Sequence, residues 1–344
     1  MSKTALVTGI TGQDGAYLAQ LLLGKGYKVY GGARRTSSLN TWRLAELGIE
    51  PEVELIDFEL METGNVLRVI ERIRPDEVYN LAAQSFVQAS FEYPIYTIET
   101  NTLGTVRILE AIRQVNPKIR FYQASTSEMY GQVQKTPQTE RTPFYPRSPY
   151  GISKLHSHWL TVNYRESYGI AASSGILFNH ESPLRGREFV TRKITSGLAL
   201  IKHGRLDVLA LGNLEAKRDW GFAGDYVEGM WLMAQAPVAD DYVLATGETH
   251  SVRHFVEAAA PQLGFAIEWQ GQGEGETGVD RKSGRTLVRI NKEHFRPAEV
   301  SVLMGSPEKA RQKLGWERRV TFNELVARMA EADERRVRDG GILL

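Results

Sequence analysis

Short apolar segments alternate with amphipathic segments along the first half of the chain. Thr4–Thr8 and Val53–Asp57 are compact runs of strand length, whereas Tyr17, Leu18 and Leu21 recur at the spacing of one helix face. The pattern predicts strands over residues 4–8, 28–32, 53–57, 77–81, 119–124 and 171–177, and helices over 14–24, 62–73, 95–114 and 150–168. Because strands that alternate with helices form a parallel sheet covered on both faces, we expect an α/β fold with a doubly wound parallel sheet.

The regularity loosens after residue 178. Helices are predicted over 190–203, 225–236, 251–263, 307–313 and 321–338, and one further strand over 241–245. Gln270–Gly278 is rich in glycine and glutamate and is predicted to be a mobile loop, and the mixed charges of Glu331–Arg338 predict a solvated helix face. We therefore expect a nucleotide-binding domain, residues 1–177 with 222–250 returning to it, and a smaller C-terminal substrate-binding lobe, residues 178–221 and 251–344.

Charge and composition argue against several classes of protein. The 344 residues carry a formal net charge of +1, which gives no basis for a nucleic-acid or membrane surface. The absence of cysteine excludes disulfides and thiol catalysis, and no apolar run approaches the length of a membrane span. His156 and His158 are two apart on a helix and make a poor metal pair, so no metal site is expected. Since no signal peptide precedes the first strand, we expect a cytoplasmic protein.

A glycine-rich turn connects the first strand to the first helix. Gly9, Gly12 and Gly15 follow the strand at the spacing G-x-x-G-x-x-G. Glycine at these points lets the backbone turn tightly and approach a pyrophosphate that sits on the helix N-terminus. Placed between a strand and a helix, the motif predicts a Rossmann-type dinucleotide site.

The end of the second strand indicates which dinucleotide binds. Arg34 and Arg35 stand where an NAD-binding protein usually has a carboxylate, and Thr36 and Ser37 follow them. Because arginines would meet a 2′-phosphate with charge-assisted contacts, NADP is favoured over NAD; a solvated basic turn or an oligomer contact is the alternative. Asp57 ends the third strand, where it could accept a hydrogen bond from adenine or cap the next turn.

Tyr150 and Lys154 are the most informative pair in the chain. Four residues apart on a helix, they share one face, and an ammonium beside a phenol is expected to lower the phenol's pKa so that Tyr150 can act as a base. Taken alone, a Tyr-x-x-x-Lys spacing is more often an ordinary amphipathic helix. Thr126 or Ser127, at the end of the strand over 119–124, can hydrogen-bond a sugar hydroxyl. Glu128 indicates a second proton transfer, unless it only caps the following loop.

These motifs together resemble the extended short-chain dehydrogenase/reductases over almost the whole chain. Gly9/Gly12/Gly15, Asn80–Ala83 and Tyr150/Lys154 carry that resemblance. More narrowly, the chain resembles the GDP-mannose 4,6-dehydratase family in residues 8–15, 34–37, 120–128, 143–150, 162–167, 176–183, 189–193, 218–221 and 295–300. The triplet Thr126–Glu128 is the most specific, since sister dehydratases carry aspartate in place of Ser127 and epimerases lack the glutamate. Ile56–Phe58 departs from the family, which more often has Gly-Asp-Leu or Gly-Asp-Met there.

The resemblance implies a role for many individual residues. The implied catalytic residues are Thr126, Glu128, Tyr150 and Lys154. The implied NADP contacts are Gly9, Thr11, Gly12, Gln13, Asp14, Gly15, Arg34, Arg35, Thr36, Ser37, Asp57, Phe58, Leu81, Ala82, Ala83, Gln84, Ser85, Tyr96, Lys154, His180 and Arg185. The implied contacts to GDP-mannose are Ser85, Ser127, Asn179, Lys193, Arg218, Arg296 and Glu299.

The reaction implied is a lyase step of deoxyhexose biosynthesis, which converts GDP-mannose to GDP-4-keto-6-deoxymannose and water through an internal NADP hydride cycle. Tyr150 would take the 4-hydroxyl proton and Glu128 the proton on carbon 5. The alternatives are an epimerase or reductase of another nucleotide sugar, against which Glu128 argues, and a non-catalytic NADP sensor, against which the intact catalytic set argues. A dimer or tetramer is also implied, with the loop Arg35–Arg43 reaching a neighbour's cofactor. The stretch Gln270–Gly284 has no assigned role.

Overall fold

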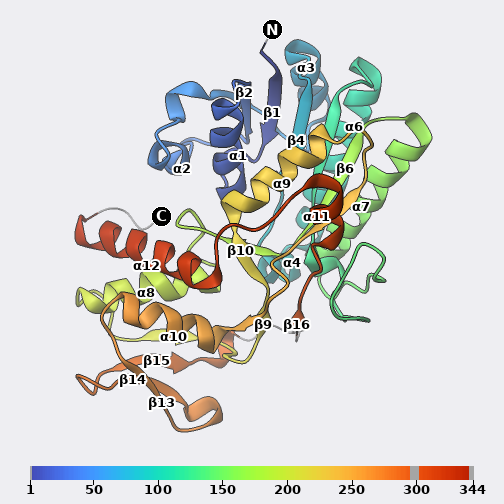
Figure 1. The fold of residues 1–344 in the computed structure, drawn as a ribbon. Helices are drawn as coiled ribbons and strands as arrows, with labels where there is room; N and C mark the ends of the chain where they lie inside the picture. Colours follow the sequence, from blue (N-terminus) through green and yellow to red (C-terminus); the bar gives the residue numbers. More distant parts are fainter. Residues whose placement is uncertain (1, 295–301, 341–344) are drawn as a thin grey trace.

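A central sheet of seven parallel strands organises the computed structural model, which describes residues 2–294 and 302–340 (Figure 1). The strand order is β11-β6-β5-β4-β1-β2-β3, and every neighbouring pair runs parallel. The strands are β1 (Thr4–Thr8), β2 (Lys28–Ala33), β3 (Glu54–Asp57), β4 (Glu77–Asn80), β5 (Arg120–Thr126), β6 (Ala172–Leu177) and β11 (Asp241–Leu244). The predicted doubly wound sheet is confirmed, and β11 returns to its edge beside β6.

Helices cover both faces of this sheet because successive strand residues point to opposite sides and both sides are apolar. In β1, Ala5 and Val7 pack into one core cluster, whereas Leu6 packs into another. The first cluster includes residues of α1 (Gln13–Gly24) and α9 (Ala223–Gln235), and the second includes residues of α3 (Thr63–Ile73), α6 (Gly104–Val115) and α7 (Pro149–Tyr168). Each fully buried leucine or isoleucine contributes about 2 kcal/mol to folding, so both layers stabilise the sheet.

The helix predicted over residues 95–114 is present but contains a wider turn. It consists of α5 (Pro94–Ile98), the π-helical segment η2 (Glu99–Leu103) and α6. In η2, the Asn101 side chain accepts from the Gln84 N–H at 2.8 Å and donates to Ser153 Oγ at 3.0 Å. Because π-helical turns interrupt the regular α-helical register, this one lets Asn101 join the loop after β4 to α7.

A second core lies below the sheet in Figure 1 and is built mainly from residues after 190. It is formed by α8 (Val190–Lys202), α10 (Val252–Gln262) and α12 (Phe322–Arg338), with a sheet of order β13-β14-β15-β8. The strands of that sheet are β8 (Leu209–Leu211), β13 (Ile267–Gln270), β14 (Thr277–Asp280) and β15 (Thr286–Ile290). The loop predicted over Gln270–Gly278 is therefore mostly the connection of an antiparallel hairpin. At the end of that stretch, Gly278 lies within β14: a Cβ there would lie 2.8 Å from Ile267 and 3.1 Å from Trp269, so the glycine makes room for packed side chains.

The solvated helix face predicted for Glu331–Arg338 is wrong at two positions. Asp333 is 0% exposed and Arg336 is 8% exposed. The Asp333 carboxylate is paired with Arg192 Nε at 2.7 Å and accepts from Thr195 Oγ1 at 2.6 Å. A buried charge that is paired and hydrogen-bonded is compatible with a protein interior, and a sequence pattern of mixed charges does not reveal such a partner.

Several short elements escaped the pattern because they are too brief to show a period. The helices among them are α2 (Trp42–Glu46) and α4 (Val87–Glu92). The helix predicted over 307–313 is present as α11 (Glu308–Leu314), shifted by one residue. The strands are β7 (Asn179–Glu181), β9 (Lys217–Arg218), β10 (Trp220–Phe222), β12 (His250–Ser251) and β16 (Val302–Leu303), and the 3-10 turns are Glu50–Glu52, Ser127–Met129, Gly273–Gly275 and Lys292–His294. Within residues 2–294 and 302–340, no helix combines the length and the apolar character that a bilayer crossing requires.

Candidate active site

The glycine-rich turn is packed too closely for side chains to replace its glycines. A Cβ at Gly15 would lie 2.4 Å from the Gly9 carbonyl oxygen. A Cβ at Gly9, whose φ is +69°, would lie 2.8 Å from the Ala82 nitrogen. Since α1 begins at Gln13, the partial positive charge of its N-terminus lies beside this turn, which is the arrangement that binds a pyrophosphate.

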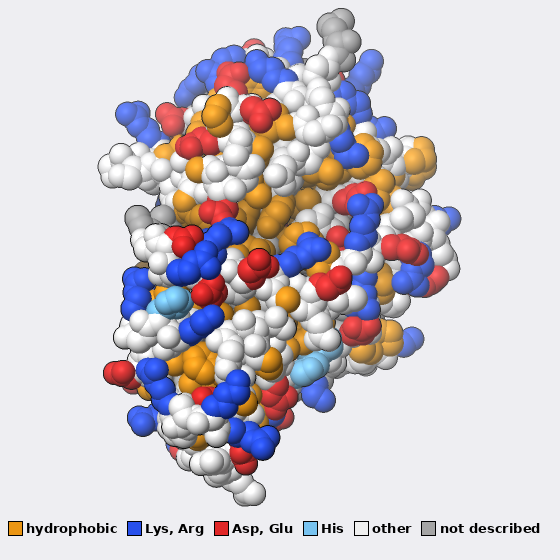
Figure 2. Space-filling model, turned by 60° about the vertical axis from the view of Figure 1, so that its left-hand side comes forward, with side chains coloured by type: hydrophobic (Ala, Val, Ile, Leu, Met, Phe, Trp, Pro, Cys, Tyr) orange, Lys and Arg blue, Asp and Glu red, His pale blue; other side chains and the backbone are white. Residues whose placement is uncertain are grey.

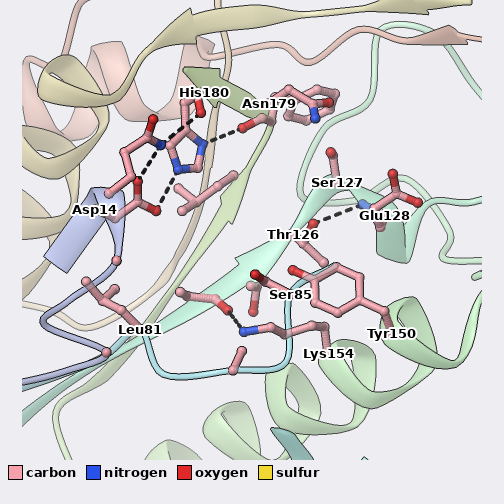
Figure 3. Close-up of a pocket in the computed structure, with 18 of the residues that line it drawn as sticks. Asp14, Leu81, Ser85, Thr126, Ser127, Glu128, Tyr150, Lys154, Asn179 and His180 are labelled. Carbon is pink, nitrogen blue, oxygen red and sulfur yellow. Dashed lines mark hydrogen bonds and ion pairs between the residues drawn. The ribbon is translucent and has the colours of Figure 1, made fainter. Parts of the chain in front are cut away.

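A cavity lies where the carboxyl ends of the central strands meet the loops that follow them; we call it the reactive cavity (Figure 3). It is lined by Gly9, Gly12, Gln13, Asp14, Gly15, Leu81, Ala83, Ser85, Val87, Ala124, Ser125, Thr126, Ser127, Glu128, Tyr150, Lys154, Leu177, Phe178, Asn179, His180, Arg185 and Phe189. Sequence reasoning missed the apolar or strand-end residues Val87, Ala124, Ser125, Leu177, Phe178 and Phe189. Ala124, Ser125 and Leu177 could have been predicted from their positions at the carboxyl ends of β5 and β6, because ligands of α/β sheets bind at these ends.

The predicted catalytic side chains converge on this cavity. Thr126 ends β5 and Tyr150 lies in the first turn of α7, and both are 9% exposed (Figure 3). The helix starts there because Ser148 Oγ accepts from the Gly151 N–H at 3.0 Å and Pro149 occupies the first helical position. The Thr126 hydroxyl hydrogen-bonds the Tyr150 phenol and accepts from the Glu128 N–H at 3.2 Å. A threonine, a tyrosine and a carboxylate therefore face one small volume.

The predicted lowering of the Tyr150 pKa by Lys154 is wrong for this structure. The pKa of Tyr150 is raised to about 12, chiefly by burial and also by the Glu128 charge, although the Thr126 hydroxyl and the Arg185 charge lower it in part. The Lys154 ammonium instead donates to the Ala124 carbonyl at 2.9 Å, and it lies 6.0 Å from the centre of the Tyr150 ring. Burial lowers the pKa of Lys154 to about 8. The two side chains share a helix face as predicted, but their charges are not in contact.

His180 forms a fixed positive charge on another wall of the cavity. Its Nε2 lies 2.7 Å from Asp14 Oδ2 and its Nδ1 lies 2.7 Å from the Phe178 carbonyl oxygen. Both partners are acceptors, so both ring nitrogens must donate and the imidazole must be protonated. Burial alone would lower the pKa of His180, but the Asp14 carboxylate outweighs it and the pKa is raised. The pair joins the start of α1 to β7 and neutralises a carboxylate beside the pyrophosphate-binding turn.

A second cavity adjoins the first; we call it the nucleotide cavity. Asn179, Arg185 and Phe189 line both, so the two are joined. Lys193 of α8 and Arg218 of β9, predicted to hold the substrate, line the nucleotide cavity. Within the described chain, Asn179 Oδ1 is buried and has no hydrogen-bond partner. At the junction of the two cavities, this oxygen is available to accept a hydrogen bond from a ligand.

Ten of the residues assigned to the cofactor do not line the reactive cavity. Near it, Arg34 Nη1 donates to the Tyr96 hydroxyl at 2.7 Å, so two of the assigned side chains meet at an exposed point. Phe58 is 4% exposed and packs under Gly32, so its side chain belongs to the core. The others are Thr11, Arg35, Thr36, Ser37, Asp57, Ala82 and Gln84.

Two of the predicted substrate residues, Arg296 and Glu299, lie outside the described residues. Among residues 2–294 and 302–340, no group of three or more histidine, aspartate or glutamate side chains could hold a metal ion.

Comparisons with known proteins identify the family of this chain. The chain matches the family model for GDP-mannose 4,6 dehydratase over residues 6–329. It is 53% identical over 338 residues to the GDP-mannose 4,6-dehydratase of Sinorhizobium fredii, covering 96% of both chains. It is 50% identical over 339 residues to the human GDP-mannose 4,6 dehydratase, covering 96% of this chain and 91% of the human one.

A solved structure supports the same architecture. The UDP-glucose 4-epimerase of Thermus thermophilus, in complex with NAD, is 26% identical and superposes with a TM-score of 0.78, covering 96% of this chain and 98% of that chain. The fold is thus shared with sugar-nucleotide enzymes of different chemistry, whereas the match over the full sequence is to one family. This chain belongs to the GDP-mannose 4,6-dehydratase family.

Proposed function

We propose that this chain binds NADP and GDP-mannose across the two joined cavities and dehydrates the sugar to GDP-4-keto-6-deoxymannose. One observation carries the proposal: Thr126, Glu128 and Tyr150 meet in the reactive cavity, and that cavity opens into one lined by Lys193 and Arg218. The cationic side chains suit a diphosphate, and the reactive end suits a sugar hydroxyl. A hexose joined to a nucleoside diphosphate fits this order of contacts.

The cradle for the cofactor is the glycine-rich turn. The absence of space for a Cβ at Gly9 and Gly15 and the adjoining α1 N-terminus fit a pyrophosphate. Arg34, held by the Tyr96 hydroxyl, and its neighbour Arg35 fit a ribose 2′-phosphate, which favours NADP. When bound, the nicotinamide accepts hydride from carbon 4 of the sugar and returns it to carbon 6.

Tyr150 takes the proton of the 4-hydroxyl, which Thr126 orients. For this step the Tyr150 pKa must fall from about 12. The Thr126 hydroxyl and the Arg185 charge already act in that direction, and a positive charge bound beside the phenol would lower the pKa further. The burial that raises the Tyr150 pKa also strengthens the effect of any such charge.

Glu128 performs the second proton transfer. The new ketone at carbon 4 acidifies the proton on carbon 5, and the Glu128 carboxylate removes it. The carbon 6 hydroxyl leaves with that proton as water, and a carbon–carbon double bond forms between carbons 5 and 6. When hydride is returned to carbon 6, carbon 5 must take a proton, and Tyr150 holds the one removed from the 4-hydroxyl. Ser127, 2% exposed beside Glu128, can hold a sugar hydroxyl during this step.

An isotope experiment tests the whole sequence. GDP-mannose carrying deuterium at carbon 4 is incubated with the enzyme, and the product is analysed by mass spectrometry and NMR. Product lighter by one water, with deuterium at carbon 6, is expected. A product of unchanged mass and inverted configuration would instead establish an epimerase, and deuterium in released NADPH a reductase.

The choice of NADP is tested separately. Replacing Arg34 and Arg35 by alanine should weaken NADP binding by about 10-fold or more while leaving NAD binding nearly unchanged, because a charge-assisted contact contributes about 1.5–3 kcal/mol. Isothermal titration with both dinucleotides measures this. If the affinities for NADP and NAD fell equally, the two arginines would not contact the 2′-phosphate.

The chain also carries a surface suited to a second copy of itself. Ile95 of α5 is 72% exposed, and Ile152 and Trp159 of α7 are 52% and 56% exposed. The two helices pack side by side, so these side chains form an apolar face of the kind that homodimers bury. Replacing Trp159 by glutamate should shift the sedimentation of the protein toward the monomer.

A further inference from the structure

Three consecutive backbone carbonyls at the junction of the two cavities are each held by a different arginine. Arg336 Nη1 donates to the Pro183 carbonyl at 2.8 Å, Arg43 Nε to that of Leu184 at 2.7 Å, and Arg192 Nη1 to that of Arg185 at 2.5 Å. We call these three side chains the carbonyl clamp. Arg336 comes from α12, Arg43 from α2 and Arg192 from α8, which lie far apart in the sequence.

The clamp is itself fixed by buried charges. Arg192 and Asp333 are both 0% exposed and pair at 2.7 Å. Arg336 donates to the same Asp333 oxygen at 3.2 Å and to Glu46 Oε1 of α2 at 2.9 Å. On the face that α2 and α12 share, basic and acidic side chains lie next to one another (Figure 2). The fully buried Arg192–Asp333 pair is expected to hold one geometry, because separating the two would leave a buried charge uncompensated.

What the clamp holds is the backbone of Arg185. The Arg185 guanidinium packs 3.5 Å from the centre of the Phe189 ring, and its Nε lies 3.0 Å from Glu181 Oε2. Both cavities have Arg185 in their walls. A shift of the 183–185 backbone would therefore move this cation relative to the cofactor and to the nucleotide at once.

The clamp also reaches the glycine-rich turn. Arg43 Nη1 donates to the Thr11 carbonyl at 2.9 Å, so one guanidinium joins the turn to the 183–185 segment. Ser182 strengthens the same link, since its hydroxyl donates to Gln13 Oε1 at 2.7 Å and accepts from the Leu184 N–H at 3.0 Å. The two walls of the reactive cavity are thereby held at a fixed separation.

We propose that Arg336, Arg192 and Arg43 are positioning residues, which act on ligand binding through the placement of Arg185. The positioning role rests on the proposed function in one respect: both cavities must bind anionic ligands. According to this proposal, α12 affects ligand affinity through Arg185, although no α12 residue lines either cavity.

A double-mutant cycle on Arg336 and Arg185 tests the proposal. The neighbouring arginine supplies a matched control: Arg335 also pairs with Glu46 Oε1, at 3.0 Å, but its side chain is 54% exposed and, unlike that of Arg336, is not hydrogen-bonded to a carbonyl of the 183–185 segment among the described residues. Binding of NADP and of GDP is measured by titration calorimetry, well below the melting temperature of each variant. Arg336→Met should weaken both ligands by about 10-fold, and Arg335→Met should leave both within about two-fold, the range of an ordinary surface change.

The cycle separates positioning from general destabilisation. If Arg336 acts through Arg185, the double variant should bind no more weakly than Arg185→Met alone. Additive losses, or normal affinity in a less stable Arg336→Met protein, would refute the clamp. Normal affinity in Arg185→Met would instead refute the predicted contact between Arg185 and the bound ligands. If Arg336→Met does not fold, Arg336→Lys, which keeps the charge beside Asp333 and Glu46 with fewer donors, is measured in the same cycle against the same two outcomes.

Discussion

The reactive cavity and the nucleotide cavity adjoin each other, yet their polar side chains have different tasks. In the reactive cavity, Tyr150 and Lys154 are almost completely buried, and burial shifts the pKa values of both against their charged forms. In the nucleotide cavity, Lys193 is partly exposed and burial lowers its pKa as well, but its role there requires only that it stay charged. The pKa of Tyr150 must therefore change before the phenol can take a proton, whereas Lys193 has only to keep its charge in order to bind a phosphate.

The difference predicts which kinetic constant each side chain controls. Residues of the reactive cavity act on groups that change charge during the reaction, so their loss should lower kcat. Residues of the nucleotide cavity make the same contact before and during the reaction, so their loss should raise KM alone.

The largest effect is expected for Tyr150→Phe. The variant keeps the ring but cannot take the 4-hydroxyl proton, so kcat should fall by about 1,000-fold, within the range for a lost general base. Steady-state assays at saturating GDP-mannose measure this, with Tyr145→Phe, an exposed tyrosine nearby, as the control. A loss confined to KM would erase the distinction between the cavities.

A somewhat smaller loss is expected for Glu128→Gln. The amide keeps the shape but cannot accept the carbon 5 proton, so product formation should fall by about 100-fold while oxidation at carbon 4 continues. Absorbance of reduced nicotinamide on the enzyme should then rise after GDP-mannose is added, and Tyr150→Phe should show no such rise. Near-normal turnover in Glu128→Gln would contradict the dehydration mechanism.

The third prediction concerns stability and pH. The Lys154 pKa is about 8 in the folded chain against 10.5 for an ordinary lysine, so folding is opposed by the charge below pH 8 and this penalty fades as pH rises from 8 to 10.5. Lys154→Met should therefore be more stable at pH 7 by about 2 kcal/mol, after allowing for the lost hydrogen bond to Ala124, and inactive. Chemical denaturation at pH 7 and pH 10 checks this. A gain that does not shrink toward pH 10 would show that the Lys154 charge is not its source.

The smallest effect is expected in the nucleotide cavity. Lys193→Met should raise KM for GDP-mannose by about 10-fold with little change in kcat, the result of losing one charge-assisted contact. Lys202→Met on the same helix, whose lysine pairs with Glu334 at 3.4 Å outside the cavity, is the control. A fall in kcat for Lys193→Met would show that this lysine takes part in the chemical step, and would contradict the distinction between the two cavities.

Much of the nucleotide-binding half could be predicted because its signals are local. Each strand of the sheet is a short apolar run, the turn at Gly9–Gly15 needs glycine for reasons internal to the turn, and Tyr150 and Lys154 share a face through helix geometry alone. The family's motifs then placed Thr126 and Glu128 beside them, and the structure brings all four to one cavity.

The tertiary structure alone decided where the charges act. The sequence placed Lys154 next to Tyr150, but the direction of its ammonium depends on the Ala124 carbonyl, thirty positions away along the chain. Asp333 and Arg336 look like surface charges until α8 supplies Arg192 and α2 supplies Glu46. A periodic pattern records which face a residue is on; it does not record which distant element covers that face. Burial and pairing set the free energy of a charge, and both arise only when elements remote in sequence meet.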